Sequence, residues 1–340
     1  MKVLLTGAAG FINGYLVPEL LAAGHTVVGV DNLSKYGPVA KSYDGHERYS
    51  FVEGDAKDRE LLTALAADCD QVVAAAAMIG GISYFHEFAF DLLAENERIL
   101  AATFEAAIAA RRVGRLERIV VVSSSMVFES TTTFPTPEGA ELTSPPPLST
   151  YGFQKLASEY FARGAWQQYG LPYTIVRPFN CVGIGERRAL RDTTVTSGNV
   201  KLALSHVVPD LAVKVLRGQD PLHILGDGNQ VRHYTYGGDL GRGIRLAMES
   251  SAAVNEDFNL STPVGTTVLE LAELVWRKVH GPGRPFRHVS DPPFEHDVQL
   301  RVPDVRKARD VLGFEATTTL DETLDEVIPW IRAEEAAGVI

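Results

Sequence analysis

Residues 3–13 read VLLTGAAGFIN, and this stretch decides the fold because it joins a strand, a turn and a helix. Val3–Leu5 is a short apolar run typical of a buried strand. Phe11–Ala23 has a helical pattern that a glycine ends. Between them, Gly7 and Gly10 allow a tight turn and let the backbone approach a pyrophosphate, whose charge faces the helix N-terminus. The stretch predicts a dinucleotide site, against the alternative of a tight turn without a ligand.

Outward from this stretch, short β-branched runs alternate with longer helical patterns, which is typical of a parallel sheet covered by helices. We expect an α/β fold with a Rossmann-type doubly wound parallel sheet and a smaller, mixed α/β C-terminal substrate-binding region. Residues 1–178 form the predicted dinucleotide-binding domain, and residues 179–340 mainly the substrate domain, with segments after 230 returning to the first. Further strands are expected at 26–30, 50–52, 71–75, 118–123, 173–176, 222–225, 231–236 and 258–260, and further helices at 59–67, 88–112, 151–169, 200–217, 269–280, 305–312 and 320–330.

The composition excludes several classes of protein. The 340 residues carry a formal net charge of −11, which argues against a nucleic-acid partner because no basic surface is available for phosphates. No apolar run is long enough for a signal peptide or a membrane helix. The two cysteines give no disulfide framework, and the histidines lack the spacing of metal ligands. We therefore expect a soluble, cytoplasmic protein without a metal or a membrane partner.

An aspartate follows the second predicted strand and selects the dinucleotide. Asp31 lies about 20 residues beyond the glycine turn, where a carboxylate can bind the adenosine ribose hydroxyls. A 2′-phosphate would meet a like charge there, so NAD is favoured over NADP, although Lys35 is close enough in sequence to weaken this contrast. The alternative is a solvated turn aspartate. Asp55, after the third strand, could reach the adenine or cap the next helix.

Tyr151 and Lys155 form the candidate catalytic pair. Their i, i+4 spacing places a phenol and an ammonium on one face of a helix. The positive charge favours the phenolate, whose unperturbed pKa is about 10, so the phenol could remove a proton from an alcohol as a hydride leaves the same carbon. Ser124 follows a predicted buried strand and could hydrogen-bond the reacting oxygen. Taken singly, Tyr151 and Lys155 have the alternative of an ordinary pair on the surface of a helix, and Ser124 has the alternative of a polar loop.

Together these motifs resemble the extended short-chain dehydrogenase/reductases, and among them the NAD-dependent nucleotide-sugar epimerases, most similarly the UDP-glucuronate and UDP-glucose 4-epimerases. The matching pieces occur in order along nearly the whole chain: TGAAGFIN, Asp31-Asn32, Gly54-Asp55, 72–77, Asn96, SSSMVF, YGFQK, RPFN at 177–180, GDGNQVR at 226–232 and RVPD at 301–304. The resemblance implies NAD that stays bound and is reused, and catalysis by Tyr151, Lys155 and Ser124. It also implies a homodimer formed through the helices at 88–112 and 151–169. The implied NAD contacts are Gly7, Gly10, Phe11, Ile12, Asp31, Asn32, Asp55, Ala56, Ala75, Ala76, Ala77, Asn96, Tyr151 and Lys155.

The residues after Ser124 bear on the type of reaction. By resemblance, dehydratases and decarboxylases carry an acidic residue just after the catalytic Ser or Thr. Here Ser125 and Met126 occupy those positions, and a thioether does not accept a proton at working pH. Epimerisation at C4 through a transient 4-keto sugar needs no such group. A dehydratase or decarboxylase remains the alternative.

The resemblance also implies how a nucleotide sugar is bound. Arg232 and Arg301 would clamp the diphosphate, since arginine pairs with phosphate through two parallel hydrogen bonds. Asn180 would add a polar contact, and Asp304 would bind the nucleotide ribose. The base would contact His206, Val207, His223 and Leu225. These residues leave the identity of the base open, although uracil is the commonest base in the family.

Arg187 is the candidate for recognition of the sugar. In relatives that act on UDP-glucuronate an arginine near this point meets the sugar carboxylate, and Ser125 would add a hydroxyl beside it. The expected reaction is therefore the conversion of UDP-glucuronate to UDP-galacturonate. The alternatives are a 4-epimerase of UDP-glucose and UDP-galactose or of UDP-GlcNAc, with Arg187 paired to Glu186 or to solvent.

A non-catalytic member of the superfamily, either an NAD sensor or an RNA-binding protein, is the alternative from another class. Such members often lose the tyrosine or the lysine of the catalytic pair, and RNA binders gain basic patches. Tyr151 and Lys155 are both present and the net charge is −11, so the sequence favours an enzyme.

Overall fold

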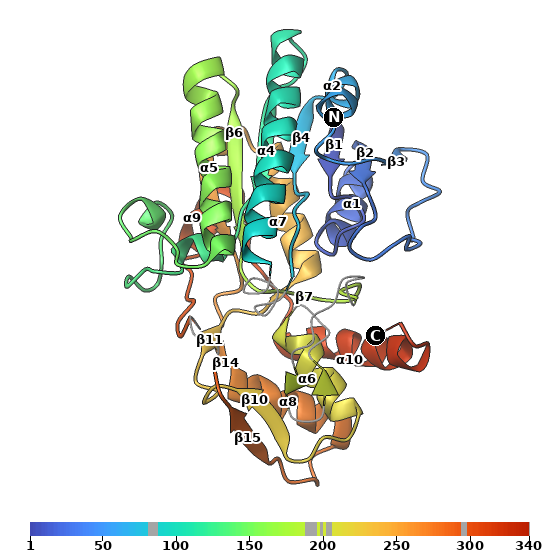
Figure 1. Ribbon diagram of the computed structural model, residues 1–340, viewed down its shortest axis with the longest axis vertical. Coiled ribbons are helices and arrows are strands. Elements are labelled where there is room, and N and C mark those ends of the chain that lie inside the picture. Colours follow the sequence, from blue (N-terminus) through green and yellow to red (C-terminus); the bar gives the residue numbers. More distant parts are fainter. Residues whose placement is uncertain (81–87, 188–195, 198–199, 202–205, 294–297, 340) are drawn as a thin grey trace.

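The computed structural model describes residues 1–80, 88–187, 196–197, 200–201, 206–293 and 298–339 (Figure 1). Its upper part is a seven-stranded parallel sheet in the order β13-β6-β5-β4-β1-β2-β3. The strands are β1 (Lys2–Thr6), β2 (Thr26–Asp31), β3 (Tyr49–Glu53), β4 (Gln71–Ala74), β5 (Arg118–Val122), β6 (Tyr173–Pro178) and β13 (Glu256–Leu260). The predicted Rossmann-type sheet is confirmed. Its strand order reverses between β1 and β4, and ligands bind at such a switch point.

Helices cover both faces of the sheet because alternate side chains of each strand point to opposite faces. Leu5 faces α1 (Asn13–Ala22) and α7 (Gly237–Glu249), whereas Leu4 faces the other layer. That other layer consists of α2 (Arg59–Ala66), α4 (Ala89–Arg112) and α5 (Thr150–Tyr169). Both side chains are almost fully buried, which explains why β1 is a continuous apolar run.

A smaller layer lies beyond the carboxyl ends of the strands (Figure 1). It contains α6 (Val207–Leu216), α8 (Val268–His280) and α10 (Leu320–Ala336), together with the parallel pair β10 (Leu222–Leu225) and β15 (His288–Asp291). Its core surrounds Trp276, which is fully buried. The remaining elements are short: β7 (Cys181–Val182), β8 (Thr196–Ser197), β9 (Val200–Lys201), β11 (Val231–Arg232), β12 (Thr235–Tyr236), β14 (Thr266–Thr267), α9 (Arg306–Leu312), and the 3-10 turns η1 (Ser125–Phe128), η2 (Ala140–Leu142) and η3 (Ser251–Ala253).

Several of the predicted elements were wrong in extent, among them the helix expected at 320–330, which runs to Ala336. The helix expected at 200–217 begins only at Val207, because the backbone at His206 is extended. The strand expected at 231–236 is divided into β11 and β12, since the chain changes partners from β14 to β7. The first helix begins at Asn13 rather than at Phe11. No helix among the described residues is long and apolar enough to cross a membrane.

Helix α7 was not predicted, because its sequence is rich in glycine. A Cβ at Gly241 would lie 2.9 Å from the backbone of Tyr15 on α1, and one at Gly243 would lie 2.8 Å from the ring of Phe314. The glycines therefore permit close packing of α7 on its neighbours, and this packing outweighs their low helix propensity.

Candidate active site

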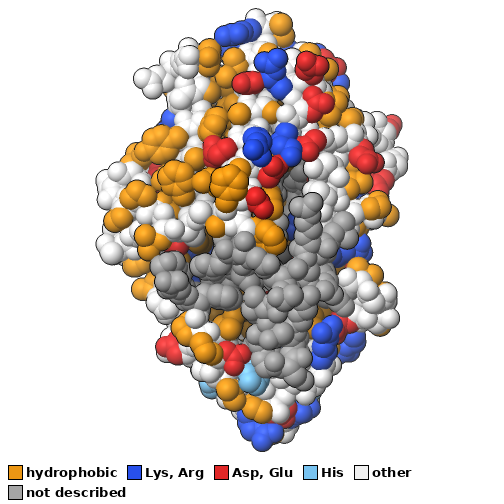
Figure 2. Space-filling model, viewed as in Figure 1, with side chains coloured by type: hydrophobic (Ala, Val, Ile, Leu, Met, Phe, Trp, Pro, Cys, Tyr) orange, Lys and Arg blue, Asp and Glu red, His pale blue; other side chains and the backbone are white. Residues whose placement is uncertain are grey.

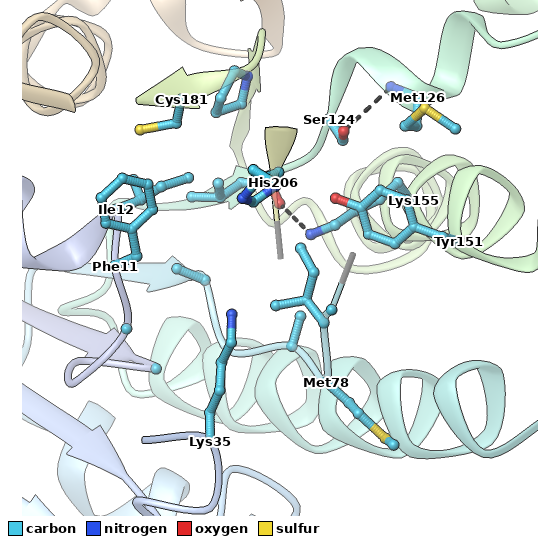
Figure 3. A pocket seen from close by; sticks show the side chains of 18 of the residues that line it. Phe11, Ile12, Lys35, Met78, Ser124, Met126, Tyr151, Lys155, Cys181 and His206 are labelled. Carbon is cyan, nitrogen blue, oxygen red and sulfur yellow. Dashed lines mark hydrogen bonds between the residues drawn. The ribbon is translucent and has the colours of Figure 1, made fainter. Parts of the chain in front are cut away.

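A cavity of about 910 Å³ lies at the carboxyl ends of the central strands, between the sheet and the smaller layer. The β1–α1 turn and the ends of β2, β4 and β5 line one side of it, and α6, β10 and β11 contribute to the other. Figure 3 shows Tyr151 and Lys155 projecting from α5, Ser124 beside them, and Lys35 pointing in from the segment after β2. The cavity therefore occupies the switch point of the sheet.

The glycine turn forms a backbone cradle at one end of this cavity. Gly7 has a φ of +75°, and a Cβ there would lie 2.8 Å from the Cα of Ala76. Thr6 Oγ1 accepts hydrogen bonds from the backbone N–H groups of Ala75 (3.2 Å) and Ala76 (3.1 Å). The Asn13 side chain donates to the carbonyl of Gly7 at 2.7 Å. Sequence reasoning did not assign these roles to Thr6 and Asn13; their signal is a polar residue on either side of the glycine turn.

Asp31 lies at the same end of the cavity and is held by the backbone. Its carboxylate accepts hydrogen bonds from Ala9 N (3.0 Å) and Leu33 N (2.8 Å). Burial raises the pKa of Asp31, and these hydrogen bonds and Lys41 and Lys35 oppose that shift. A carboxylate has lone pairs for further donors such as ribose hydroxyls. The cradle and this acceptor fit a dinucleotide with an unsubstituted ribose.

The other expected dinucleotide contacts lie at or near this end. The cavity is lined by Gly7, Gly10, Phe11, Ile12, Asp31, Asn32, Asp55, Ala56, Ala75, Ala76 and Ala77. Asn96 is not among the lining residues, so its expected contact stays a prediction. Its side-chain amide makes two hydrogen bonds with the backbone of Met78. It accepts from Met78 N at 2.6 Å and donates to Met78 O at 2.9 Å. Asn96 thus orients a segment that does line the cavity.

The candidate catalytic residues meet where α5 approaches the end of β5. The Ser149 hydroxyl caps α5 by accepting from Gly152 N at 3.0 Å. Lys155 Nζ donates to the carbonyl of Val122 at 2.9 Å, and Ser124 hydrogen-bonds Tyr151. Tyr151, Lys155 and Ser124 all line the cavity. The structure therefore brings the three residues together.

The electrostatics of this group differ from the expectation that Lys155 lowers the pKa of Tyr151. Burial raises the pKa of Tyr151, and the hydrogen bond from Ser124 and the charge of Arg301 oppose that shift. Burial lowers the pKa of Lys155 to about 8, against the charge of Glu159. The ammonium donates to the carbonyl of Val122, and Ser124 and Arg301 are the groups that oppose the raised pKa of Tyr151.

The expected diphosphate clamp lines the opposite part of the cavity. Arg232 and Arg301 are 69 positions apart, but Arg301 N donates to the carbonyl of Val231 at 3.3 Å, so the two arginines lie on neighbouring backbone segments. Arg301 Nη1 also donates to Asn180 Oδ1 at 3.3 Å. Asn180, Ser125, Met126, His206, Val207 and Leu225 line the cavity as well.

Three expected substrate contacts are not among the lining residues and stay predictions. The guanidinium of Arg187 pairs with Glu334 of α10, with Nε 2.8 Å from Oε2. Asp304 pairs with Arg306, and His223 Nδ1 lies 2.8 Å from Asp291. Each of these side chains has a polar partner within the described residues, and none of the three is among the residues that line the cavity.

One side of the Tyr151 ring packs against hydrophobic side chains. Tyr151 packs with Leu92 and Met126, and Met78, Ile79 and Val298 lie against this cluster. Among the described residues, no group of three His, Cys, Asp or Glu side chains could hold a metal ion. The site thus combines a dinucleotide cradle, a buried phenol and an arginine pair. These features define the class of Rossmann-fold enzymes that act on a nucleotide-linked alcohol.

Comparison with known proteins identifies the family. Residues 3–261 match the NAD dependent epimerase/dehydratase family, and the chain belongs to it. The expected resemblance and the NAD-dependent family are thereby confirmed. The chain is 28% identical to the UDP-glucose 4-epimerase of Mycolicibacterium smegmatis, over 98% of this chain and 99% of that protein. It is 26% identical to UDP-glucuronic acid decarboxylase 1 of Xenopus tropicalis, over 98% of this chain and 72% of that protein.

A solved structure is similar over the whole chain. The UDP-glucose 4-epimerase of Thermotoga maritima, crystallised with UDP-glucose, superimposes with a TM-score of 0.78 and 30% identity. The match covers 98% of this chain and 100% of that one. The relatives therefore support an enzyme of nucleotide-sugar metabolism.

Proposed function

We propose that this protein is an NAD-dependent 4-epimerase of a UDP-sugar, with Tyr151 as the acid and base. The observation that carries the proposal is the placement of Tyr151, Lys155 and Ser124 in the cavity that also contains the glycine cradle. Ser125 and Met126 follow Ser124, at the positions where the family resemblance implies an acidic residue in dehydratases and decarboxylases. The UDP-glucose 4-epimerases among the relatives support the same reaction.

The residues present fit the cofactor. Gly7 and Gly10 would hold the pyrophosphate of NAD at the start of α1, and Asp31 would bind the adenosine ribose. Bound NAD would supply a hydride acceptor that can return the hydride to either face of the sugar. Asp55 and Asn32, joined by a hydrogen bond of 3.4 Å, lie at the adenosine end.

In this proposal Tyr151 moves the proton of the sugar 4-hydroxyl. Burial favours the neutral phenol, so the phenolate depends on the Ser124 hydrogen bond and the charge of Arg301. When the substrate binds, the Ser124 hydroxyl would donate its one proton to the reacting oxygen instead and hold that oxygen against Tyr151. The phenol then returns the proton when the opposite stereoisomer forms. Arg232 and Arg301 would hold the diphosphate while the sugar turns, so the binding energy comes from the remote part of the substrate.

The surroundings of Tyr151 favour a sugar with an uncharged C6 group. Arg187, the expected partner of a carboxylate, pairs with Glu334 and does not line the cavity. Met78, Ile79 and Met126, which pack in the same cluster as Tyr151, are apolar and offer no counter-charge to a carboxylate placed against them. We therefore propose UDP-glucose and UDP-galactose as the substrates, in place of the UDP-glucuronate expected from the sequence.

Turnover of UDP-sugars by the purified protein tests the proposal. Incubation with UDP-glucose, UDP-galactose and UDP-glucuronate, followed by chromatography, is expected to yield the C4 epimer of the first two. Tyr151→Phe is expected to lower kcat by about 100-fold or more, because it removes the proton donor and acceptor. Tyr160→Phe is the matched control, since Tyr160 is exposed on the same helix. Faster epimerisation of UDP-glucuronate would contradict the sugar, and full activity of Tyr151→Phe would contradict the mechanism.

A further inference from the structure

Three side chains on one face of α5 form hydrogen bonds, here called ties, with three successive residues, 122–124, at the end of β5. Tyr151, Lys155 and Glu159 follow one another at i, i+4 and i+8 and so lie along one side of the helix. Ser124 hydrogen-bonds Tyr151, and Lys155 Nζ donates to Val122 O at 2.9 Å. The third tie is the Ser123 hydroxyl, which donates to Glu159 Oε1 at 2.7 Å.

Glu159 is the most firmly held member of this row. Arg177 of β6 donates to both of its carboxylate oxygens, from Nε to Oε1 and from Nη2 to Oε2, each at 2.7 Å. Glu159 and Arg177 are both fully buried. Two parallel hydrogen bonds between ionised groups fix orientation as well as distance. Glu141 and Asp257 also pair with Arg177, at 3.0 and 2.7 Å, so the cation is fixed from several elements.

Glu159 does not line the cavity, so it has no contact with a ligand there. Its carboxylate joins the helix that carries Tyr151 and Lys155 to the strand end that carries Ser124. Without this tie, the hydroxyl of Ser123 and one side of Arg177 would lose their acceptor. The relative position of α5 and β5 therefore depends on Glu159.

We propose that Glu159, held by Arg177, is a positioning residue that sets α5 against the end of β5 and so places Tyr151 and Lys155 for catalysis. The inference rests on the proposed function for its catalytic consequence, but the geometry of the tie does not depend on the substrate. Glu159 also acts through its charge. Burial lowers the pKa of Lys155 to about 8, and Glu159 is the neighbour that raises it.

Other ionisable groups around Lys155 do not duplicate this charge. The cavity that Lys155 lines also contains Asp91 and Glu95 of α4, Glu129, Tyr151, Cys181 and Arg301, and Arg177 lies beyond Glu159. Glu159 is the charged neighbour that opposes the effect of burial on the pKa of Lys155. Removal of its negative charge therefore lowers that pKa further, and the ammonium is lost at a lower pH.

The experiment compares three variants of the full-length protein. Glu159→Gln removes the charge and keeps the shape, and Ser123→Ala removes the tie and keeps the charge. Glu141→Gln is the matched control, because it removes one charge from the same Arg177 cluster without touching Ser123. The ionisation of Lys155 is followed by NMR of protein with ¹³C-labelled lysine, with the signal assigned by Lys155→Met. kcat and KM are measured with the UDP-sugar that the wild type epimerises.

The proposal predicts that Lys155 titrates about one pH unit lower in Glu159→Gln and at the wild-type pH in the other two variants. Ser123→Ala and Glu159→Gln are each expected to lose about tenfold in kcat with little change in KM, because the tie positions groups that act in the transition state. An unshifted Lys155 in folded Glu159→Gln, or full kcat in Ser123→Ala, overturns the proposal. If Glu159→Gln does not fold because Arg177 is left uncompensated, Ser123→Ala decides alone.

The readouts separate this inference from the proposed function. The titration of Lys155 needs no substrate, so a shift in Glu159→Gln supports the charge effect even if no UDP-sugar is epimerised. Failure of the wild type to epimerise any UDP-sugar would overturn the proposed function only. An unshifted titration in an active epimerase would overturn the role of Glu159 only.

Discussion

A single carboxylate at the end of β2 governs the choice between NAD and NADP. Asp31 is fixed by Ala9 N and Leu33 N, and Lys35 points into the same cavity. Asp31→Ser removes the charge that would repel a 2′-phosphate and leaves the cation. We expect this variant to bind NADP about tenfold more tightly than the wild type does, as measured by fluorescence titration. Asp55→Ser is the control, and an equal gain in both variants would show that only net charge matters.

The pH dependence of the site follows from Lys155. Its pKa is lowered to about 8, so the ammonium is present below that pH and is lost as the pH rises through it. If the positive charge supports the phenolate of Tyr151, kcat falls on the alkaline side near pH 8. Lys155→Met is expected to abolish this alkaline limb together with most of the activity. A profile that stays flat to pH 10 would exclude the role of the ammonium.

At the scale of elements, α7 depends on two glycines that make room for its neighbours. Gly241→Ala would place a Cβ 2.9 Å from the backbone of Tyr15. We expect a lower free energy of unfolding despite the better helix propensity of alanine. Gly164→Ala on α5 is the matched control, because no atom lies within 4 Å of a Cβ there. That variant is expected to gain about 0.5–1 kcal/mol in denaturant unfolding. Stabilisation by both substitutions would contradict the packing argument.

The same elements show how far the sequence determines the fold and the site. The sheet was predictable because β1 and β5 are apolar runs buried on both faces, and the glycine turn and the Tyr151–Lys155 pair because their spacing is local. Helix α7 was missed because its glycines meet Tyr15, more than 200 positions away. The pairing of Arg187 with Glu334 was not predictable because the two residues are 147 positions apart. Contacts between distant segments leave no signal in local periodicity.

At the scale of the whole molecule, α4 and α5 leave an apolar surface uncovered. Figure 2 shows hydrophobic side chains gathered over the face that these helices form. Phe90 of α4 is 79% exposed, and Phe153 and Tyr160 of α5 are 48% and 58% exposed. Large aromatic side chains in one patch favour a protein interface. We propose that a second copy of the chain covers this surface, which is the homodimer implied by the family resemblance.

A dimer through α4 and α5 predicts how charge placed on this surface changes the assembly. Phe153→Glu combined with Tyr160→Glu would bury two unpaired carboxylates at a two-fold interface in each chain, which costs several kcal/mol. We expect the wild type to have twice the chain mass by light scattering after size-exclusion chromatography, and the double variant to have the mass of one chain. Val264→Glu is the control, because Val264 is exposed outside both helices and its replacement leaves the dimer intact. A wild type with the mass of one chain, or a double variant that remains dimeric, would show that these aromatic side chains do not form the interface.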